Sequence, residues 1–486
     1  MEQQLSIFDS LYPKYKINKP IRLIEFFAGY GSQALALKYL GVKFEHYKIC
    51  EWAVKSIQAY QDIHIQDYFD YSENMSDENV IDYLLRVGIS ANYNEPANKS
   101  QIKRMNFRQI YNNIIATNNL VNIQNIKGSD LDMVGIDRYD YILTYSFPCQ
   151  DLSLAGKGKG MSDTSTRSGM LWEVERILTE CKELGNLPQI LLMENVPQVH
   201  GVNNVQDFNK WKYKLEELGY KNYFQDLIAT DYGIPQTRNR CFMISILGDY
   251  NYTFPKPIPL KLKLKDMLED NVDEKYYLSD RQLESLESGS YNASKPSVKL
   301  QITDKGLCQT LDTMSGGNRQ PLIRDKNATK KGYLEATDGD GIDISSRMEH
   351  HRGTVQKGMT QTITTMGGEN NGVVVNRFYE QALETLNNNK VKDGDIIDAY
   401  NQKVLTDGNS PTITTRPEGF KTAILPVQDL RIRKLTPKEC FRLMGVRDED
   451  FERCAKHQSD SSLYHLAGDS IVVNVLMAIF KELVKE

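Results

Sequence analysis

A cysteine follows a proline directly after an apolar run of the kind that forms a buried strand. The run YDYILTYSF covers residues 139–147, and Pro148 and Cys149 come next. A thiolate is a strong nucleophile, and Pro148 restricts the backbone before it. The segment GKGKG, residues 156–160, is flexible enough to fold over a substrate, and its lysines can meet phosphates. Because inert burial is the commoner fate of a lone cysteine, Cys149 is at this point only a candidate nucleophile.

An acid and two cations occur where they could face that thiol. Glu194 stands near the end of the buried run PQILLMENV, residues 188–196. Arg238 and Arg240 take alternate positions in QTRNR, residues 236–240, which leads into an apolar run, so both are expected to point to one face of a strand. Burial would raise the pKa of Glu194 and let it deliver a proton or a hydrogen bond. A capped strand end and a solvated arginine face are the structural alternatives.

A glycine turn near the N-terminus has the spacing of a nucleotide-binding turn. Gly29 and Gly31 begin a G-x-G-x-x-G/A pattern that ends at Ala34, between a predicted strand and a predicted helix. Glu51 follows about twenty residues on, at the end of the next strand, where such folds hold a ribose hydroxyl. Trp52 could supply an aromatic face for an adenine. The pattern alone is equally compatible with a plain tight turn or with an NAD-dependent oxidoreductase.

These residues must be positioned by strands that alternate with helices, in the spacing of a parallel, doubly wound sheet. The pattern predicts strand, glycine turn, helix, strand and helix over residues 21–60, and it resumes from residue 138. We therefore expect an α/β fold with a mostly parallel sheet in residues 1–249. Residues 62–127 are polar, rich in asparagine and helical in places, and are interpreted as an insertion.

The chain changes character near residue 250. A segment of threonine, glycine and β-branched residues recurs at intervals of about fifty residues, at Thr310, Thr362 and Thr412. Residues 250–430 are therefore predicted to form a second, smaller and mostly β domain. Helical patterns return in residues 431–486, which are expected to rejoin the first domain.

Composition restricts the class of protein less than the motifs do. The 486 residues are 40% hydrophobic and 25% charged, as in ordinary globular proteins. The seven cysteines are scattered without metal-ligand spacing, so neither a zinc site nor a disulfide framework is expected. The sequence has no leader pattern and no long apolar run, which favours a cytoplasmic protein without membrane contact. The net charge of -5 neither indicates nor excludes binding to nucleic acid.

Several short segments occur in a fixed order, namely EFFAGYG, TYSFPCQDLS, MENVP, IPQTRNR, RKLTPKECFRLMG and HLAGDSIVVNV. In this order they resemble the motifs of the DNA (cytosine-5) methyltransferases of bacterial or phage type. The resemblance covers residues 21–60, 128–246 and 431–480. It implies a Rossmann-like methyltransferase fold that uses S-adenosylmethionine to methylate C5 of a cytosine flipped out of double-stranded DNA. Residues 250–430 would then read the target sequence.

The resemblance also implies catalytic roles. Cys149 would add covalently to C6 of cytosine and so activate C5. Glu194 would stabilise the adduct at N3 and the exocyclic amine, and Arg240 would hold O2. Arg238 would support the site, and Asn195 would organise the loop that carries Cys149. No residue is assigned as the base that removes the C5 proton.

A second set of residues is expected around S-adenosylmethionine. Phe27 and Trp52 would pack against the adenine. Glu51 would bind the ribose hydroxyls, and Asp130 the adenine amine. The complete set implied by the resemblance is Phe27, Gly29, Gly31, Glu51, Trp52, Asp130, Pro148, Leu171, Asp469 and Ser470.

Three positions depart from the family pattern. Glu25 stands where the family usually has Asp, Asp469 where it has Asn, and Asn474 where it has Pro. The substitution by Asp469 leaves the cofactor contact at this position open.

The sequence also permits other interpretations. A cytosine-5 methyltransferase that acts on tRNA would carry similar motifs, although the long region 250–430 favours duplex DNA. An oxidoreductase would leave the ordered thiol, acid and arginines unexplained, and a non-catalytic DNA-binding protein would not need the thiol. For the leading hypothesis we expect a monomer in a bacterial cell or phage-infected host, with a companion restriction endonuclease as a candidate partner.

Overall fold

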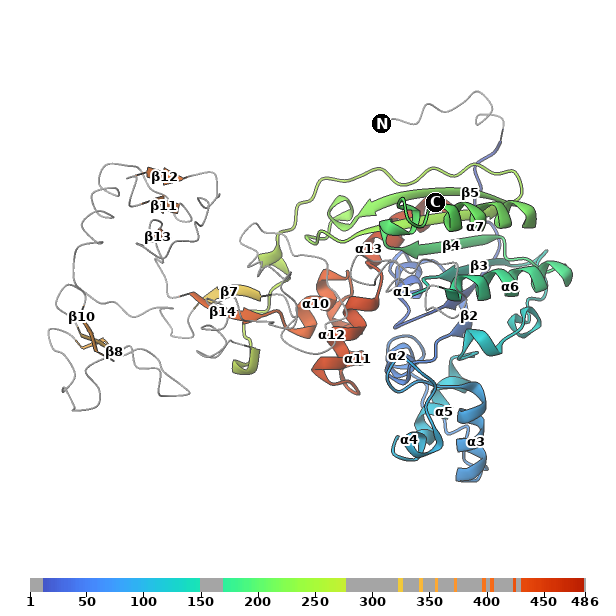
Figure 1. Ribbon diagram of the computed structural model, residues 1–486, viewed down its shortest axis with the longest axis horizontal. Coiled ribbons are helices and arrows are strands. Elements are labelled where there is room, and N and C mark those ends of the chain that lie inside the picture. Colours follow the sequence, from blue (N-terminus) through green and yellow to red (C-terminus); the bar gives the residue numbers. More distant parts are fainter. Residues whose placement is uncertain are drawn as a thin grey trace. The chain divides into compact units, whose positions relative to one another are not determined.

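The computed structural model describes residues 12–148, 169–276 and 435–484, together with short strands between residues 322 and 434. Its main feature is a six-stranded sheet in the order β2-β1-β3-β4-β6-β5 (Figure 1). β2, β1, β3 and β4 run parallel, whereas β6 is antiparallel to β4 and β5 is antiparallel to β6. The predicted α/β fold with a mostly parallel sheet is confirmed. The strands are β1 Ile21–Phe26, β2 Phe44–Cys50, β3 Asp140–Tyr145, β4 Ile190–Asn195, β5 Tyr220–Ile228 and β6 Asn239–Leu247.

Strand direction decides which residues meet at one edge of this sheet. β1, β2, β3 and β4 all end at the same edge because they are parallel. β6 begins at that edge, since Asn195 of β4 pairs with Cys241 and Glu194 pairs with Phe242. Ligands bind beyond the carboxyl ends of the strands in open α/β sheets. The carboxyl edge therefore receives the ends of four strands and the first residues of β6.

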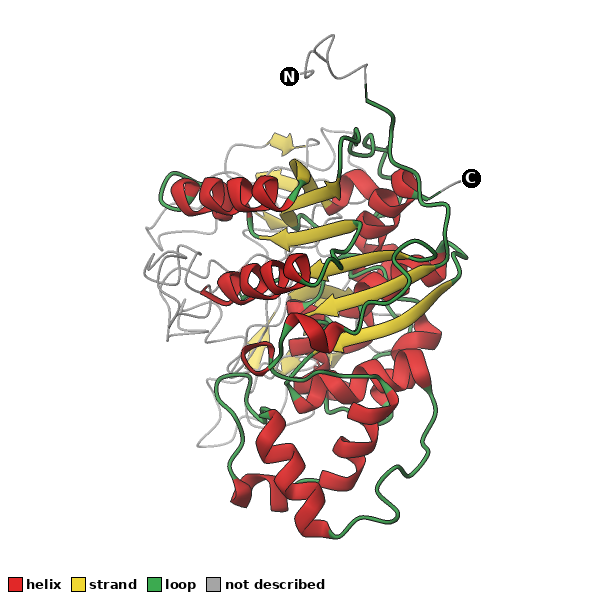
Figure 2. Ribbon diagram, turned by 90° about the vertical axis from the view of Figure 1, so that its right-hand side faces the viewer, coloured by secondary structure: helices red, strands yellow, loops and turns green. Residues whose placement is uncertain are grey.

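Helices cover both faces of the sheet (Figure 2), because its central strands are apolar on both sides. Every residue of β3 and β4 is buried. On one face α6, Met170–Glu183, and α7, Val205–Leu218, pack with alternate residues of these strands into the main core. The other face carries α1, Ser32–Tyr39, whose Ala34 N–H donates to Glu25 of β1, and α1 in turn packs against α13, Val473–Leu483.

The predicted insertion forms a helical unit with its own core. α3 (Asp77–Val87), α4 (Lys99–Lys103) and α5 (Phe107–Ala116) supply most of that core, with Ile57 of α2, Val54–Tyr60. Each helix begins at a side chain that caps a backbone N–H, as expected at Ser and Asn. The capping residues are Ser76, Asn98 and Asn106. A polar, Asn-rich sequence can therefore still form well-defined helices around a small apolar centre.

The residues from Thr436 onward belong to the same compact unit as the main sheet. α10 (Pro437–Leu443) begins with a capping box between Thr436 and Glu439, and α11 (Asp448–Ala455) and α12 (Asp460–Asp469) follow. The segment Asp460–Leu483, which joins α12 to α13, is apolar enough to cross a membrane, but 72% of its most apolar window is buried inside the fold. Its hydrophobicity is explained by core packing.

The described residues divide into two compact units. The first contains those up to Glu269 and those from Thr436, and the second contains those between Asp270 and Leu435. The second unit pairs β7, Leu322–Lys326, with β14, Leu430–Lys434, and has two further sheets in the orders β10-β8-β9 and β12-β11-β13. Their strands are β8 Gly341–Asp343, β9 Val355–Gln356, β10 Asn371–Val373, β11 Ile396–Asp398, β12 Lys403–Leu405 and β13 Ala423–Ile424. The domain limits 1–249, 250–430 and 431–486 stay predictions. The repeat positions Thr310, Thr362 and Thr412 lie outside the described residues.

One strand is not predicted from the sequence. β5 carries the polar residues of YKNYFQDLI and lies at the edge of the sheet, where three of its residues are exposed in succession. An edge strand packs on fewer neighbours than a central one, so its sequence lacks the apolar run by which β3 and β4 are recognised.

Candidate active site

The residues predicted to carry the chemistry come from the carboxyl edge of the sheet. β4 brings Glu194 and Asn195 there, β6 brings Arg240, and the end of β3 leads to Pro148. β3 and β4 are neighbours, with Tyr145 opposite Met193. Cys149 itself lies outside the described residues, and so does the GKGKG segment. The described part of the site therefore consists of the residues around Pro148, which directly precedes Cys149.

Glu194 and Arg240 form a partly buried ion pair. Arg240 Nε lies 3.2 Å from Glu194 Oε1, and the two side chains are 17% and 9% exposed. Burial raises the pKa of Glu194, and the charges of Arg240 and then Arg238 oppose that shift. The carboxyl group can therefore take up a proton more readily than an exposed glutamate. A group of this kind can act as acid or hydrogen-bond donor toward a substrate.

Asn195 holds the end of β3 against the end of β4. Its side-chain Nδ2 donates to the carbonyl of Phe147 at 3.0 Å, and its Oδ1 accepts from the N–H of Val196 at 2.8 Å. The side chain is buried, so both bonds form away from water. Phe147 is two residues before Cys149. Asn195 therefore fixes the backbone two residues before Cys149.

Arg238 does not lie in the strand that the sequence predicts for it. β6 begins at Asn239, and the buried Arg238 donates from Nη2 to the carbonyls of Gly468 at 3.0 Å and Ser470 at 2.7 Å. Arg238 and Arg240 nevertheless line one small pocket with Phe242, and both charges act on Glu194. Arg238 also ties the start of β6 to the end of α12, while Arg240 pairs with Glu194.

The glycine turn and Glu51 form a second part of the site. The carboxylate of Glu51 accepts from the N–H of Gly29 at 2.9 Å and of Ala53 at 2.8 Å. Burial raises the pKa of Glu51 to about 7, and these two backbone donors oppose the shift. Gly31 has φ of 81°, and a Cβ at this position would lie 2.4 Å from His64 Nε2. The turn thus needs glycine both for its backbone and for its packing.

The other residues expected at the cofactor differ in burial and in their distance from the glycine turn. Ser470 Oγ lies 3.9 Å from where a Cβ of Gly29 would be, so the C-terminal segment borders the glycine turn. Phe27 and Trp52 are partly buried, whereas Leu171 is completely buried in the main core at the start of α6. Asp130 and Asp469 are more exposed than these residues.

Asp130 is exposed and belongs to a local turn. Its carboxylate accepts from the N–H of Lys127 at 2.8 Å at the start of a 3-10 helix, Gly128–Leu131. Asp469 is 45% exposed and lies 2.9 Å from His465 Nε2, one helical turn earlier. Asp130 keeps free acceptor capacity, and Asp469 introduces a negative charge beside Ser470.

Two groups of residues that sequence reasoning missed support the glycine turn. Asn119 makes two hydrogen bonds to the backbone of Glu51. Its Oδ1 accepts from the N–H of Glu51 at 3.0 Å, and its Nδ2 donates to the carbonyl of Glu51 at 2.9 Å. Below the turn Tyr60 donates to the buried Glu25 at 2.6 Å, and burial raises the pKa of Glu25 to about 7. His64 Nε2 lies 2.9 Å from the carbonyl of Tyr30. In an Asn-rich segment nothing in the sequence distinguishes Asn119 from its neighbours.

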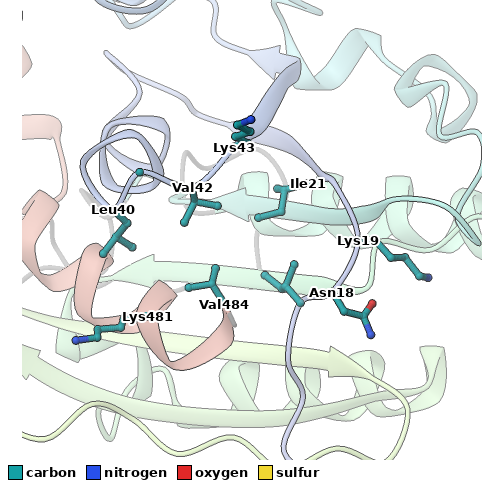
Figure 3. A pocket seen from close by; sticks show the side chains of 10 residues that line it. Asn18, Lys19, Ile21, Leu40, Val42, Lys43, Lys481 and Val484 are labelled. Carbon is teal, nitrogen blue, oxygen red and sulfur yellow. The ribbon is translucent and has the colours of Figure 1, made fainter. Parts of the chain in front are cut away.

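Two other features lie away from this frame. A cavity of 620 Å³ opens beside Ile21, the first residue of β1, and is therefore at the amino edge of the sheet, opposite Glu51 and Glu194 (Figure 3). The ligand atoms of His200, Asp226 of β5 and Cys241 of β6 lie within 4.8 Å of one another, a grouping that sequence spacing could not reveal. His200 and Asp226 are already hydrogen-bonded at 2.9 Å, and Cys241 bonds to Asp226, which accounts for the grouping without an ion.

Comparisons with known proteins agree with the geometry. The family model for C-5 cytosine-specific DNA methylase matches residues 84–485. The chain is 30% identical over 469 residues to the type II methyltransferase M2.ScrFI of Lactococcus lactis subsp. cremoris, covering 96% of this chain and 99% of that protein. It is 32% identical over 402 residues to the orphan methyltransferase M.SssI of Spiroplasma monobiae, covering 81% and 95%.

A solved structure shares the fold. The S. pombe Dnmt2 methyltransferase superimposes with a TM-score of 0.50 at 14% identity, covering 95% of this chain and 97% of that one. The ordered motifs, the carboxyl-edge site and a family match over most of the chain lead to one assignment. The chain belongs to the C-5 cytosine-specific DNA methylase family and is a DNA (cytosine-5) methyltransferase.

Proposed function

We propose that this enzyme methylates C5 of a flipped-out cytosine through a covalent bond between Cys149 and C6, with S-adenosylmethionine as the methyl donor. The observation that carries the proposal is the link from Asn195 to the carbonyl of Phe147, next to the Glu194–Arg240 pair. This link joins the acid-bearing strand to the backbone that continues into Cys149. A nucleophile and an acid held on adjacent strand ends are what the reaction requires.

The chain's own residues would act as follows. The thiolate sulfur of Cys149 forms a bond to C6, and the electrons of the C5–C6 double bond move into a C4–C5 double bond while those of the C4–N3 double bond move onto N3. Glu194, with its raised pKa, donates a hydrogen bond or proton at N3, which stabilises the electron-rich ring. Arg240 holds O2, and Arg238 keeps Gly468 and Ser470 in place. S-adenosylmethionine supplies an electrophilic methyl group to C5. Loss of the C5 proton then re-forms the double bond and expels the sulfur.

The residues around the glycine turn fit the proposed cofactor. The Glu51 carboxylate accepts from the backbone N–H groups of Gly29, Ala53 and Trp52, and a carboxylate has about four acceptor sites, which leaves capacity for a ribose hydroxyl. Gly29 has no side chain to block the close approach of a ligand. Phe27 and Trp52 keep part of their rings uncovered, which suits contact with a purine. Asp130 has one carboxylate oxygen that accepts from the N–H of Lys127, and the carboxylate keeps acceptor capacity for an amine.

The substrate and cellular setting are also proposed. Duplex DNA would be read by residues 250–430, and the enzyme would act as a monomer in the cytoplasm of a bacterium or phage-infected host. The type II relative supports a companion restriction endonuclease, whereas the orphan relative supports a methyltransferase that works alone. A neighbouring endonuclease gene, whose product is blocked by DNA from cells that express this enzyme, would distinguish these two arrangements.

Transfer of a tritiated methyl group tests the proposal. Purified enzyme and S-adenosylmethionine carrying the label are incubated with duplex DNA or with tRNA. We expect label in DNA, and bisulfite sequencing of that DNA should show one recurrent sequence around the protected cytosines. Cys149→Ala should abolish transfer, whereas Cys454→Ala, a control at a completely buried cysteine of α11, should retain it. Label in tRNA alone, or transfer by Cys149→Ala, would overturn the proposal.

A further inference from the structure

A loop of the inserted helical unit lies against the segment that follows β2. Ser90 N–H donates to the carbonyl of Trp52 at 2.7 Å, and Val54 N–H donates to the carbonyl of Ser90 at 2.9 Å. Ala97 N–H donates to Ile89 at 2.7 Å and closes the base of the loop. These bonds attach the loop to residues next to Glu51, which borders the glycine turn.

Tyr93 lies at the tip of this loop in a strained conformation. Its φ is 64°, in the left-handed region that side chains other than glycine rarely adopt. Asn92 holds the turn, because its Oδ1 accepts from the N–H groups of Asn94 at 3.0 Å and Glu95 at 3.2 Å. The Tyr93 ring packs on His465 with the ring centroids 4.0 Å apart. Strain held in place by a built turn is common at functional sites.

His465 lies between Tyr93 and Asp469, and Asp469 directly precedes a residue that borders the glycine turn. His465 Nε2 lies 2.9 Å from Asp469 Oδ2. Ser470 follows directly and borders Gly29. The negative charge of Asp469 acts on Glu51 and, together with burial, favours protonation of Glu51. Tyr93, His465 and Asp469 thus connect the inserted unit to both sides of the proposed cofactor site.

Charge distinguishes the methyl donor from the product it leaves. S-adenosylmethionine carries a positive sulfonium, whereas S-adenosylhomocysteine carries a neutral thioether. A carboxylate several ångströms from a partly buried site attracts the cation more strongly than the neutral analogue. Glu51 is paired with backbone donors, whereas Asp469 is partly exposed beside His465 and adds a second carboxylate charge that acts on Glu51.

We propose that Tyr93, His465 and Asp469 form one wall of the cofactor site, and that Asp469 favours the cationic methyl donor over its neutral product. Tyr93 packs on ligand groups that both molecules share and lies away from the sulfonium, which an aromatic face would attract more than the thioether. This inference rests on the proposed use of S-adenosylmethionine. It assigns part of the cofactor site to the inserted segment.

Isothermal titration calorimetry of the full chain without DNA tests the proposal. Asp469→Asn keeps the size of the side chain but removes the charge. We expect the ratio of the Kd for S-adenosylhomocysteine to the Kd for S-adenosylmethionine to fall about 3- to 10-fold, the range for one partly exposed charge. Raising the salt concentration should lower this ratio in the unmodified enzyme and have less effect in Asp469→Asn.

Tyr93→Ala should weaken both ligands by a similar factor of about 10, as expected for loss of an aromatic contact, and should leave their ratio unchanged. Tyr93→Phe keeps the ring and should bind like the unmodified enzyme. Tyr83→Ala is the matched control, because Tyr83 packs on Tyr111 elsewhere in the inserted unit, with ring centroids 4.9 Å apart. Thermal melting confirms that each variant is folded.

The outcomes separate this inference from the proposed function. An unchanged ratio in folded Asp469→Asn contradicts the charge discrimination. Equal weakening by Tyr93→Ala and Tyr83→Ala shows that the ring acts only through the stability of the inserted unit, and contradicts the wall. If the unmodified enzyme binds neither ligand, the proposed cofactor is wrong, and this inference fails with it.

Discussion

Gly31 and Gly41 share a left-handed backbone but differ in what a methyl group would meet. Their φ values are 81° and 71°. A Cβ at Gly31 would lie 2.4 Å from His64 Nε2 and 2.6 Å from Tyr60 Cε2, whereas a Cβ at Gly41 would meet nothing within 4 Å. Substitution by alanine therefore imposes backbone strain at both positions and steric overlap at only one of them.

The expected magnitudes follow from these two terms. Left-handed backbone costs a non-glycine residue about 1 to 2 kcal/mol, so Gly41→Ala should lower the free energy of unfolding by about that amount. Overpacking a tight interior adds about 1 to 3 kcal/mol, so Gly31→Ala should lose about 2 to 5 kcal/mol in total. Because Gly31 lies in the turn beside Glu51, Gly31→Ala should also weaken cofactor binding, and Gly41→Ala should not.

Urea denaturation and calorimetric titration with S-adenosylmethionine measure both effects. The double variant Gly31→Ala/His64→Ala should recover part of the stability, because it removes the atom nearest to the new methyl group while the contact with Tyr60 remains. Equal losses for Gly31→Ala and Gly41→Ala would refute the packing argument. Unchanged cofactor binding in a folded Gly31→Ala would refute the placement of the cofactor at this turn.

Two further predictions concern buried carboxyl groups. Glu194→Gln keeps the shape of the side chain but removes its titratable proton, so kcat for methyl transfer should fall about 10²- to 10⁴-fold while cofactor affinity stays unchanged; a normal kcat would contradict its role as acid. Glu25 has a folded-state pKa of about 7, above the ordinary value, so its contribution to stability is complete at low pH and is lost as the pH rises through about 7. Urea denaturation should therefore show the unmodified enzyme losing stability between about pH 5 and 8, by up to about 3 kcal/mol from this group, and Glu25→Gln losing less. A pH dependence that is identical in the two proteins would contradict this account.

The central strands and the acid could be predicted from sequence because their signals are local. IRLIEFF and PQILLMENV are apolar runs of strand length, and the structure has β1 and β4 there. Parallel neighbours end at one edge, so the pattern alone brings Glu51 and Glu194 to the same side of the sheet. The edge strand β5 could not be predicted, because its partly exposed residues do not form an apolar run.

The supporting contacts could not be predicted because they join distant parts of the chain. Arg238 donates to the carbonyls of Gly468 and Ser470, 230 and 232 residues away. Tyr93 meets His465 across a comparable separation, and neither residue type carries a pattern that announces a partner. Side-chain to backbone bonds of this kind depend on the folded path of the chain and not on periodicity, so the backbone partners of Arg238 could not be predicted.

A mechanism-based trap tests the central claim most directly. A duplex that contains 5-fluorocytosine at the target position, incubated with enzyme and S-adenosylmethionine, should form a complex that survives denaturation, because fluorine blocks the loss from C5 that releases the enzyme. Intact mass and peptide mapping should locate the nucleotide on Cys149, and Cys149→Ala should give no complex. A stable complex through another residue, or none while methylation of ordinary cytosine proceeds, would contradict the covalent mechanism.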